Sequence, residues 1–299
     1  MSALQILLIH NPTAGKRRKK RLQALLTCLR DAGYEVQERE TKSSGDARQI
    51  ATVAIGFDLI IAAGGDGTAN DVVNGLCQRD RDEHLPTLLF FPLGTQNVLA
   101  KELDLPAEPA AYLPIIRDGH YLTFCPGIAN SKRFLLMASV GLDARAVAGV
   151  KGWLKRLIGP AAYIVAAVFA LRQGPANYDV AINGQTRQAA GVIVARAQYY
   201  GGNYKLFPGA DLSIPKLSVM TLQNYGFTAA MRYGLAMVMK RMHNLHDVDI
   251  EMTASVEIRG PGAEPVQIDG DVLTSLPLLV SLEKREVKLL IPKTHASVA

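Results

Sequence analysis

The first half of the chain alternates short β-like runs with helical patterns. Runs rich in apolar and β-branched residues predict strands over 4–9, 34–39, 57–63 and 88–91. The segments between and after them have the pattern of helices, over 17–31, 46–55, 69–77 and 97–103. Because alternating strands and helices build βαβ units, we expect a doubly wound, parallel sheet of the Rossmann type.

Beyond residue 122 the pattern changes, and β-like runs dominate. They cover 123–128, 133–140, 178–182, 191–197, 216–222, 247–252 and 256–259. This predicts a β-sandwich-like second domain with inserted helices. The uncharged run 157–171 is too short to span a bilayer, which takes about 20 residues, and predicts a buried or cleft-lining helix. The stretch 227–245 mixes Met with Arg and Lys and fits either a packed surface helix or an amphipathic interfacial one.

Two glycine-containing turns follow predicted strands. In GGDGT (64–68) the glycines let backbone N–H groups approach an anion, and Thr68 is placed to cap a helix that begins near residue 69. Asp66 would repel a phosphate unless it holds a cation, accepts a proton or orients a hydroxyl, so it favours Mg²⁺-assisted chemistry. The second turn, PLGTQN (92–97), is expected at the same carboxyl edge of the sheet. GGDGT lacks the Lys-Ser/Thr ending of a Walker A loop and the GxGxxG spacing, and alone it fits a plain strand-to-helix turn equally well.

Charge and cysteine content narrow the possible partners. The net charge is +6, and residues 16–21 are six consecutive basic residues, while the remaining 27 Lys and Arg balance the 27 Asp and Glu. This run begins a predicted helix, where the dipole disfavours positive charge, so ATP phosphates or an acidic membrane surface would compensate it, unless it is simply solvated. The run has no interleaved aromatic residues, which argues against nucleic acid. Three cysteines without metal-ligand spacing, and no leader pattern, predict a disulfide-free cytoplasmic protein without structural zinc.

Three motifs together carry a family resemblance: NPTAGK (11–16), GGDGT and PLGTQN. The chain resembles the diacylglycerol kinase and sphingosine kinase catalytic-domain family, especially its soluble bacterial lipid kinases. Further family landmarks occur in family order: TKSSGDA (41–47), NGL (74–76), SVGLDA (139–144), YYGGN (199–203) and IDGD (268–271). The resemblance implies an α/β plus β architecture: a nucleotide-binding domain like those of NAD kinases and diacylglycerol kinases over 1–122, and a β-sandwich-like acceptor domain over 123–285. It also implies an active site in the interdomain cleft and a last strand, about 286–292, that returns to the first domain.

The resemblance implies an ATP-dependent, Mg²⁺-assisted kinase that phosphorylates a lipid hydroxyl. Such chemistry needs a held triphosphate, a metal that neutralises it and an acceptor for the hydroxyl proton. The expected ATP-binding residues are Asn11, Pro12, Gly15, Lys16, Thr41, Gly64, Gly65, Asp66, Gly67, Thr68, Asn70, Gly94, Thr95 and Asn97, with Asp66 on the catalytic metal. The lipid would be met peripherally, at the inner membrane surface. Whether it is diacylglycerol-like, phosphatidylglycerol-like or sphingoid is left open, as is the oligomeric state.

Two positions depart from the family pattern. Where relatives commonly have Asp-Gly-Glu, this chain has Asp269, Gly270 and Asp271, so the expected catalytic base is a carboxylate one methylene shorter, with Asp269 and Asp271 both candidates. The same Asp-Gly pair is also a hairpin signal. After segment 207–212, relatives usually carry an Asp-Gly whose Asp helps bind a secondary Mg²⁺. Here Ile214 and Pro215 occupy that place, so the accessory site is expected to be lost or rebuilt around Asp211 and backbone carbonyls.

Three other functions stay open at this point. Nucleic-acid binding could explain the basic run 16–21, but it would first require a steep, sequence-independent salt dependence. An NAD kinase also carries GGDGT in a two-domain protein, although PLGTQNVLA (92–100) and YYGGN favour the lipid-kinase branch. The two departures also fit a noncatalytic homologue that binds nucleotide or lipid.

Overall fold

A computed structural model describes residues 4–12, 16–80, 82–149, 171–262 and 264–296. The chain divides into two compact units: unit 1 comprises Met1–Cys125, Gly201–Asn203 and Lys284–Ala299, and unit 2 comprises Pro126–Tyr200 and Tyr204–Glu283. The helix expected over 157–171 lies outside the described residues, apart from its last residue.

Unit 1 is built on a six-stranded sheet, in the order β2-β1-β3-β4-β20-β5. The strands are β1 (Gln5–His10), β2 (Glu35–Glu40), β3 (Leu59–Gly64), β4 (Thr87–Pro92), β5 (Tyr121–Phe124) and β20 (Val287–Leu290). Neighbours from β2 to β20 pair in parallel, and only β5 runs antiparallel. The helices are α1 (Lys16–Asp31), α2 (Asp46–Val53), α3 (Asp66–Cys77), α4 (Val98–Glu102), α5 (Tyr112–Asp118) and α10 (Lys293–Ala296), with a 3₁₀ turn η1 (Pro109–Ala111). The predicted doubly wound sheet is confirmed.

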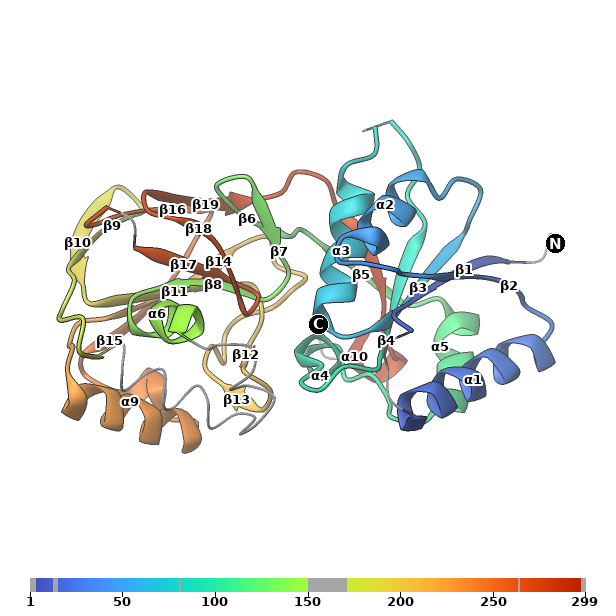
Figure 1. Ribbon diagram of the computed structural model, residues 1–299, viewed down its shortest axis with the longest axis horizontal. Helices are drawn as coiled ribbons and strands as arrows, with labels where there is room; N and C mark the ends of the chain where they lie inside the picture. The colour runs from blue at the N-terminus through green and yellow to red at the C-terminus, as the bar shows by residue number, and fades with distance from the viewer. Residues whose placement is uncertain (1–3, 13–15, 81, 150–170, 263, 297–299) are drawn as a thin grey trace. The chain divides into compact units, whose positions relative to one another are not determined.

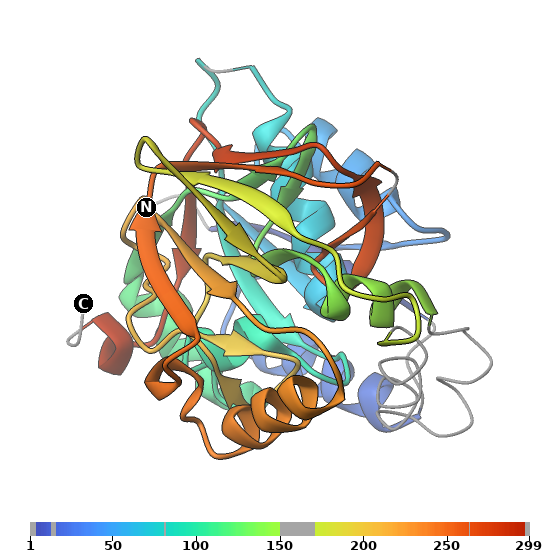
Figure 2. The same ribbon diagram turned by 90° about the vertical axis from the view of Figure 1, so that its left-hand side faces the viewer.

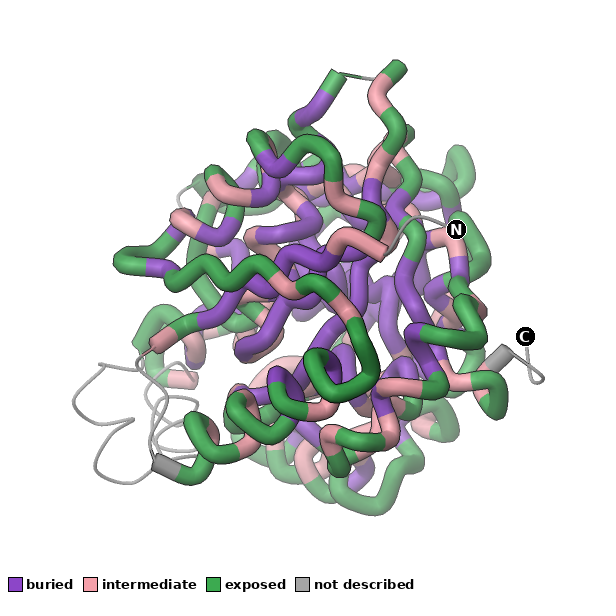
Figure 3. The backbone as a smooth tube through the Cα atoms, turned by 90° about the vertical axis from the view of Figure 1, so that its right-hand side faces the viewer, coloured by how far each residue is buried: buried purple, intermediate pink, exposed green. Residues whose placement is uncertain are grey.

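The central strands of this sheet are covered on both faces (Figure 1). Alternate residues such as Ile6, Leu8 and Ile61 pack with Leu25 and Leu29 of α1 and with residues of α5 in one apolar cluster. Helices α2 and α3 lie on the other face, and the strands form the buried centre of the unit (Figure 3). This explains why β3 is buried at every position, as expected for a parallel strand between two helical layers.

Unit 2 consists of two facing antiparallel sheets. One has the order β10-β9-β16-β19-β6-β7 and the other β15-β14-β11-β8-β17-β18. The first comprises β6 (Gly127–Ala129), β7 (Lys132–Phe134), β9 (Tyr178–Ile182), β10 (Gln185–Ala189), β16 (Ser255–Arg259) and β19 (Leu278–Leu282). The second comprises β8 (Met137–Val140), β11 (Gly191–Ala195), β14 (Leu217–Leu222), β15 (Val248–Thr253), β17 (Pro265–Ile268) and β18 (Asp271–Ser275). Inward residues of both sheets form one core, so the predicted β-sandwich is confirmed.

The remaining elements of unit 2 are short or lie outside the two sheets. They are α6 (Leu142–Gly149), α9 (Phe227–Val238), a 3₁₀ turn η2 (Met242–Asn244) and the two-residue strands β12 (Tyr199–Tyr200) and β13 (Tyr204–Lys205). Among the described residues, no helix combines the length and the apolar character needed to cross a membrane.

Some local predictions were wrong for identifiable reasons. Helix α3 begins at Asp66, not near residue 69, because the Gly65 carbonyl already accepts the N–H of Thr68 and Ala69, at 2.9 and 3.2 Å. Thr68 is therefore inside the first turn and is not the cap. The expected strand over 123–128 is divided into β5 and β6, with Pro126 between them, because proline has no N–H for a strand ladder.

Candidate active site

The carboxyl ends of β1, β2, β3 and β4 meet at one edge of the sheet in unit 1. His10, the last residue of β1, pairs with Glu40 of β2 and Ala63 of β3, and Gly64 pairs with Pro92 of β4. Predicted ATP-binding residues therefore follow four adjacent strand ends: Asn11 and Pro12; Thr41; Gly64, Gly65, Asp66, Gly67, Thr68 and Asn70; and Gly94, Thr95 and Asn97. Gly15 and the side chain of Lys16 lie outside the described residues.

The two glycine turns touch backbone to backbone. The N–H groups of Leu93 and Gly94 both donate to the Gly64 carbonyl, at 2.7 and 3.1 Å. A Cβ added to Gly94 would lie 2.6 Å from the Gly65 Cα, and one added to Gly64 would lie 2.6 Å from the Thr68 Cβ. These contacts are too close for any side chain. Glycine at position 94 therefore lets the two turns approach, and glycine at position 64 leaves room for Thr68 within the first turn.

Asp66 connects the first turn to the second. One carboxylate oxygen accepts the Val98 N–H at 3.1 Å and the other accepts the Leu99 N–H at 2.9 Å, which satisfies two donors at the start of α4. Burial raises the pKa of Asp66, and the two backbone N–H groups and Lys101 counteract this shift. Each oxygen keeps a second lone pair, so the predicted metal role stays a prediction beside this positioning role.

The first turn also forms the N-terminus of α3. Its opening residues, Asp66 and Gly67, lie in the first turn of the helix, where N–H groups have no carbonyl partner within the helix, whereas the Thr68 N–H already donates to the Gly65 carbonyl. Gly67 is exposed and has no atom within 4 Å of an added Cβ position. An exposed helix N-terminus with the positive end of its dipole outward is suited to binding a phosphate.

The basic run contacts the second turn through two arginines of α1. Arg18 donates to the Thr95 hydroxyl at 3.0 Å, and Arg21 donates to the Pro92 carbonyl at 2.9 Å and the Ala107 carbonyl at 2.7 Å. From the sequence, Arg18 and Arg21 were expected only as members of a charge run. Their spacing of three places both on one helical face, but every residue of the run 16–21 has a basic partner at that spacing, so only the contacts with the second turn distinguish Arg18 and Arg21.

Three other predicted ligands hold local backbone. Thr41 is buried, and its N–H donates to the His10 carbonyl at 2.9 Å. The Asn97 amide donates to the Gly94 carbonyl at 3.0 Å, and its backbone is left-handed, with φ of 49°. The Asn70 carbonyl accepts an amide N–H of Asn74 at 2.9 Å. Of these contacts, only that of Asn97 is made by the predicted ligand's side chain, which fixes the second turn whether or not it also contacts nucleotide.

Asp269 is the first residue of a tight hairpin turn in unit 2, and Asp271 directly follows that turn. Asp269 and Gly270, with φ of 47° and 95°, connect β17 to β18. The Asp269 carboxylate accepts three backbone N–H groups, from Leu135 at 2.8 Å, Leu136 at 3.0 Å and Met137 at 2.9 Å. Asp271 is exposed at the first position of β18, and its carboxylate has no hydrogen-bond partner among the described residues. The interpretation of Asp269-Gly270 as a hairpin turn is therefore compatible with the prediction of a catalytic base, because the hairpin leaves the Asp271 side chain exposed.

Asp211 belongs to a loop in which several backbone carbonyls already accept hydrogen bonds from a buried arginine. Its carboxylate accepts the N–H and hydroxyl of Ser213, both at 2.7 Å. The buried Arg196 guanidinium donates to the carbonyls of Leu212 and Ile214, both at 2.7 Å, and to that of Lys216. Among the described residues, no group of three His, Cys, Asp or Glu side chains is arranged to hold a metal ion.

Comparison with known proteins matches both units. The "Diacylglycerol kinase catalytic domain" profile matches residues 5–125, and the "YegS C-terminal NAD kinase beta sandwich-like domain" profile matches residues 137–291. A diacylglycerol kinase of Bacillus subtilis is 30% identical over 298 residues, covering 97% of each chain. The chain belongs to the diacylglycerol kinase family. A diacylglycerol kinase of Staphylococcus carnosus is 29% identical and covers 96% of this chain and 94% of the relative.

Solved structures support the same fold. A diacylglycerol kinase from Bacillus anthracis has a TM-score of 0.76 at 24% identity, covering 98% of this chain and 99% of the other. Yeast NADH kinase, solved with NADH, has a TM-score of 0.55 at 14% identity, covering 98% and 85%. The diacylglycerol kinase family assignment therefore agrees with the observed α/β sheet followed by a β-sandwich.

Proposed function

We propose that this chain transfers the γ-phosphate of ATP to the hydroxyl of diacylglycerol or a closely related lipid. The observation that carries the proposal is the backbone contact between the two glycine turns at Gly64 and Gly94, in a chain whose relatives are named diacylglycerol kinases. Two adjacent turns at the carboxyl edge of a parallel sheet form an anion site of the kind that phosphoryl transfer needs.

The triphosphate would contact the first turn of α3 and the second turn around Thr95. Arg18 already donates to the Thr95 hydroxyl, so its guanidinium is positioned to add a positive charge there. Mg²⁺, bound with ATP, would neutralise phosphate charge, and Asp66 is the carboxylate that would contact it. Because both Asp66 oxygens already accept backbone N–H groups, the phosphates would supply most of the metal's remaining ligands.

Asp271 would accept the proton of the lipid hydroxyl. Its exposed carboxylate can approach a substrate, whereas the Asp269 carboxylate is engaged by three backbone donors. A base must come within hydrogen-bond reach of the proton that it removes, directly or through one water. The shorter side chain of Asp271, compared with the Glu common in relatives, makes this reach the demanding part of substrate placement.

The test is a transfer assay with radiolabelled ATP and purified full-length chain. Parallel reactions contain dispersed diacylglycerol, phosphatidylglycerol, a sphingoid base or NAD, each with and without Mg²⁺. We expect Mg²⁺-dependent label in phosphatidic acid. Label only in NADP would replace this proposal with NAD kinase activity, and ATP binding without transfer to any acceptor would indicate a noncatalytic homologue.

A further inference from the structure

Helix α9 has an inverted amphipathic pattern. Its large apolar side chains are exposed by half or more: Phe227 63%, Met231 60%, Leu235 63% and Val238 60%, followed by Met239 at 51%. The residues that α9 buries are small ones, Ala229 and Ala236. A surface helix normally directs its large apolar residues to the core, so a continuous outward stripe at helical spacing marks a binding surface.

The rotation of α9 is fixed by Tyr233, on the same side of the helix as the buried Ala229 and Ala236, and by Arg232 on the flank, whose side chain is 39% exposed. Arg232 and Tyr233 of α9 both contact the buried Asp247 carboxylate, with the Tyr233 hydroxyl at 2.5 Å. The Asn224 amide donates to the same carboxylate at 2.7 Å, and the Asn224 N–H donates to the Tyr233 hydroxyl at 3.2 Å. The stripe therefore faces outward because the hydrogen bond between Tyr233 and Asp247 holds the opposite side of the helix against the rest of unit 2. Figure 2 shows α9 as the orange helix at the periphery of unit 2.

The charge around the stripe indicates the partner. From 227 to 246 the sequence contains no Asp or Glu, and Lys240 and Arg241, which follow the stripe, are exposed. In a symmetric dimer through α9, identical basic helices would face each other, which opposes self-association. Anionic headgroups above an acyl layer match both the positive charge and the apolar stripe. We propose that α9 docks the protein on an anionic lipid bilayer, with the stripe entering the acyl boundary.

The docking proposal for α9 rests on the proposed kinase function only for the choice of lipid in the test vesicles, and the test needs no ATP. Full-length chain is sedimented with vesicles of phosphatidylcholine alone or mixed with phosphatidylglycerol. The variant Met231→Glu/Leu235→Glu places two charges in the stripe, and the matched control Ile55→Glu changes an apolar residue of unit 1 that is 76% exposed.

We expect the wild-type chain to bind the mixed vesicles. The affinity of Met231→Glu/Leu235→Glu for these vesicles should be at least about tenfold lower, and that of Ile55→Glu should equal the wild-type affinity. Replacing Lys240 with Asn and Arg241 with Gln should weaken binding to mixed vesicles only, by about fivefold per charge. Absence of wild-type binding, or equal binding by the double variant, overturns the proposal. So does a wild-type dimer that Met231→Glu/Leu235→Glu dissociates. Failure to phosphorylate a short-chain, dispersed diacylglycerol, with vesicle binding intact, would instead contradict the kinase proposal.

An independent observation concerns the accessory metal. Carbonyl oxygens are ligands for a hard divalent cation, but the carbonyls of Leu212, Ile214 and Lys216 already accept hydrogen bonds from the Arg196 guanidinium. Arg196 is only 1% exposed, and the side chains of Ile214 and Pro215 cannot bind a metal. The residues present therefore do not fit a second Mg²⁺. We infer that Arg196 is a built-in cation that holds this loop in place of a metal ion.

Thermal unfolding without nucleotide tests this inference. The wild-type midpoint should be the same in Mg²⁺ alone and in EDTA, and a rise with Mg²⁺ would overturn the inference. Arg196→Lys keeps the charge but loses the planar set of donors, so its midpoint should fall by about 5–10 °C; an unchanged midpoint would also overturn it. In Arg196→Ala/Ile214→Asp the carbonyls are freed beside a carboxylate, and we expect Mg²⁺ to raise the midpoint of that variant, and not of Arg196→Ala.

Discussion

Asp269 and Asp271 lie two positions apart in one hairpin and have different environments. Asp269 accepts three backbone N–H groups, whereas Asp271 is exposed. Asp271→Asn should therefore lower kcat at least about 100-fold while leaving the Kd of ATP unchanged. Asp269→Asn should instead lower the free energy of unfolding by about 2–4 kcal/mol, because an amide cannot accept all three donors. Rapid-quench kinetics, ATP titration and urea unfolding of the pair separate the two roles; normal turnover by Asp271→Asn would remove that residue from the mechanism.

Asp66 should show a stability effect that needs no metal. Asp66→Asn retains one acceptor oxygen and turns an NH₂ group toward the other backbone N–H, of Val98 or Leu99. We expect the free energy of unfolding, measured in EDTA without nucleotide, to fall by about 1–2 kcal/mol. If stability in EDTA is unchanged while Mg²⁺-dependent turnover is lost, Asp66 acts only at the metal.

The chemistry of individual residues was partly predictable. The residue types in the strand-to-helix turns were enough to predict that the glycines of GGDGT and PLGTQN allow a close backbone approach. They also predicted that the Asp66 carboxylate has a role of its own. The hydrogen-bond partners of Asp66 could not be predicted, because Val98 and Leu99 are 32 and 33 residues away in the chain and only the sheet brings them near. The roles of Arg18 and Arg21 were hidden for the same reason, since their contacts lie 77 and 71 residues away.

Between elements, the contact of the two turns depends on Gly94. In Gly94→Ala the new Cβ would lie 2.6 Å from the Gly65 Cα and 2.5 Å from the Asn97 Oδ1, so the turns must separate. We expect the free energy of unfolding to fall by about 2 kcal/mol and the Kd of ATP to rise at least about tenfold. Gly67→Ala is the matched control for stability, because nothing lies within 4 Å of its Cβ position. Equal stability of the two variants would contradict the proposed contact.

The anchoring of α9 should depend on pH through Asp247. Burial opposes its charge, but hydrogen bonds from Asn224 and Tyr233 and the charge of Arg232 lower the pKa of Asp247 overall. The stabilisation is therefore complete above the unfolded pKa of about 3.9 and is lost as pH falls through the lower folded value. Asp247→Asn should cost about 2 kcal/mol near neutral pH, with the difference from wild type shrinking in acid. Urea unfolding at a series of pH values checks this, and a difference that is constant into acid would count against the anchor.

Elements with a strong local pattern were predictable, and those defined by distant partners were not. Strand β9 was predicted at its observed bounds, because the large apolar residues Tyr178, Val180 and Ile182 stand at alternate positions. The expected strand over 133–140 divides into β7 and β8, since the intervening N–H groups donate to Asp269 rather than to a neighbouring strand. Strands β10, β12, β13, β17, β18 and β19 were missed. The β18 pattern, with exposed Val272 and Leu273, departs from half-buried alternation.

At the scale of the whole molecule, the division into an α/β sheet and a β-sandwich follows from the change of pattern near residue 122. The return of the C-terminal strand was expected from family resemblance, because a short apolar run near the end does not reveal its sheet. The structure places β20 between β4 and β5, where it pairs in parallel with one and antiparallel with the other. Residues 284–299 are therefore part of unit 1 although they follow unit 2 in the chain.

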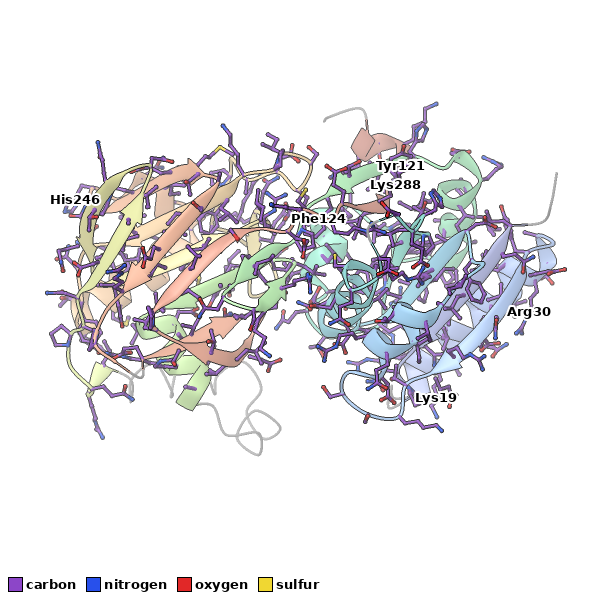
Figure 4. The ribbon with its side chains drawn as sticks, turned by 90° about the horizontal axis from the view of Figure 1, so that it is seen from above. Lys19, Arg30, Tyr121, Phe124, His246 and Lys288 are labelled. Carbon is purple, nitrogen blue, oxygen red and sulfur yellow. The ribbon has the colours of Figure 1, made fainter. Side chains whose placement is uncertain are left out.

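This topology predicts that unit 1 cannot form without the C-terminal segment. Val287 and Leu289 are buried, and β20 is the only sheet partner of β5 within the described residues, so a chain ending at Glu283 leaves β4 and β5 with unpaired edges. Within β20, Leu289→Ala should cost about 2–5 kcal/mol. The adjacent Lys288→Ala should cost under about 1 kcal/mol, since Lys288 is exposed and lies 4.8 Å from the Tyr121 ring centroid (Figure 4). Hydrogen exchange of the truncated chain should show β1–β4 unprotected while β9, β11 and β16 stay protected; protection of β1–β4 without β20 would contradict the prediction.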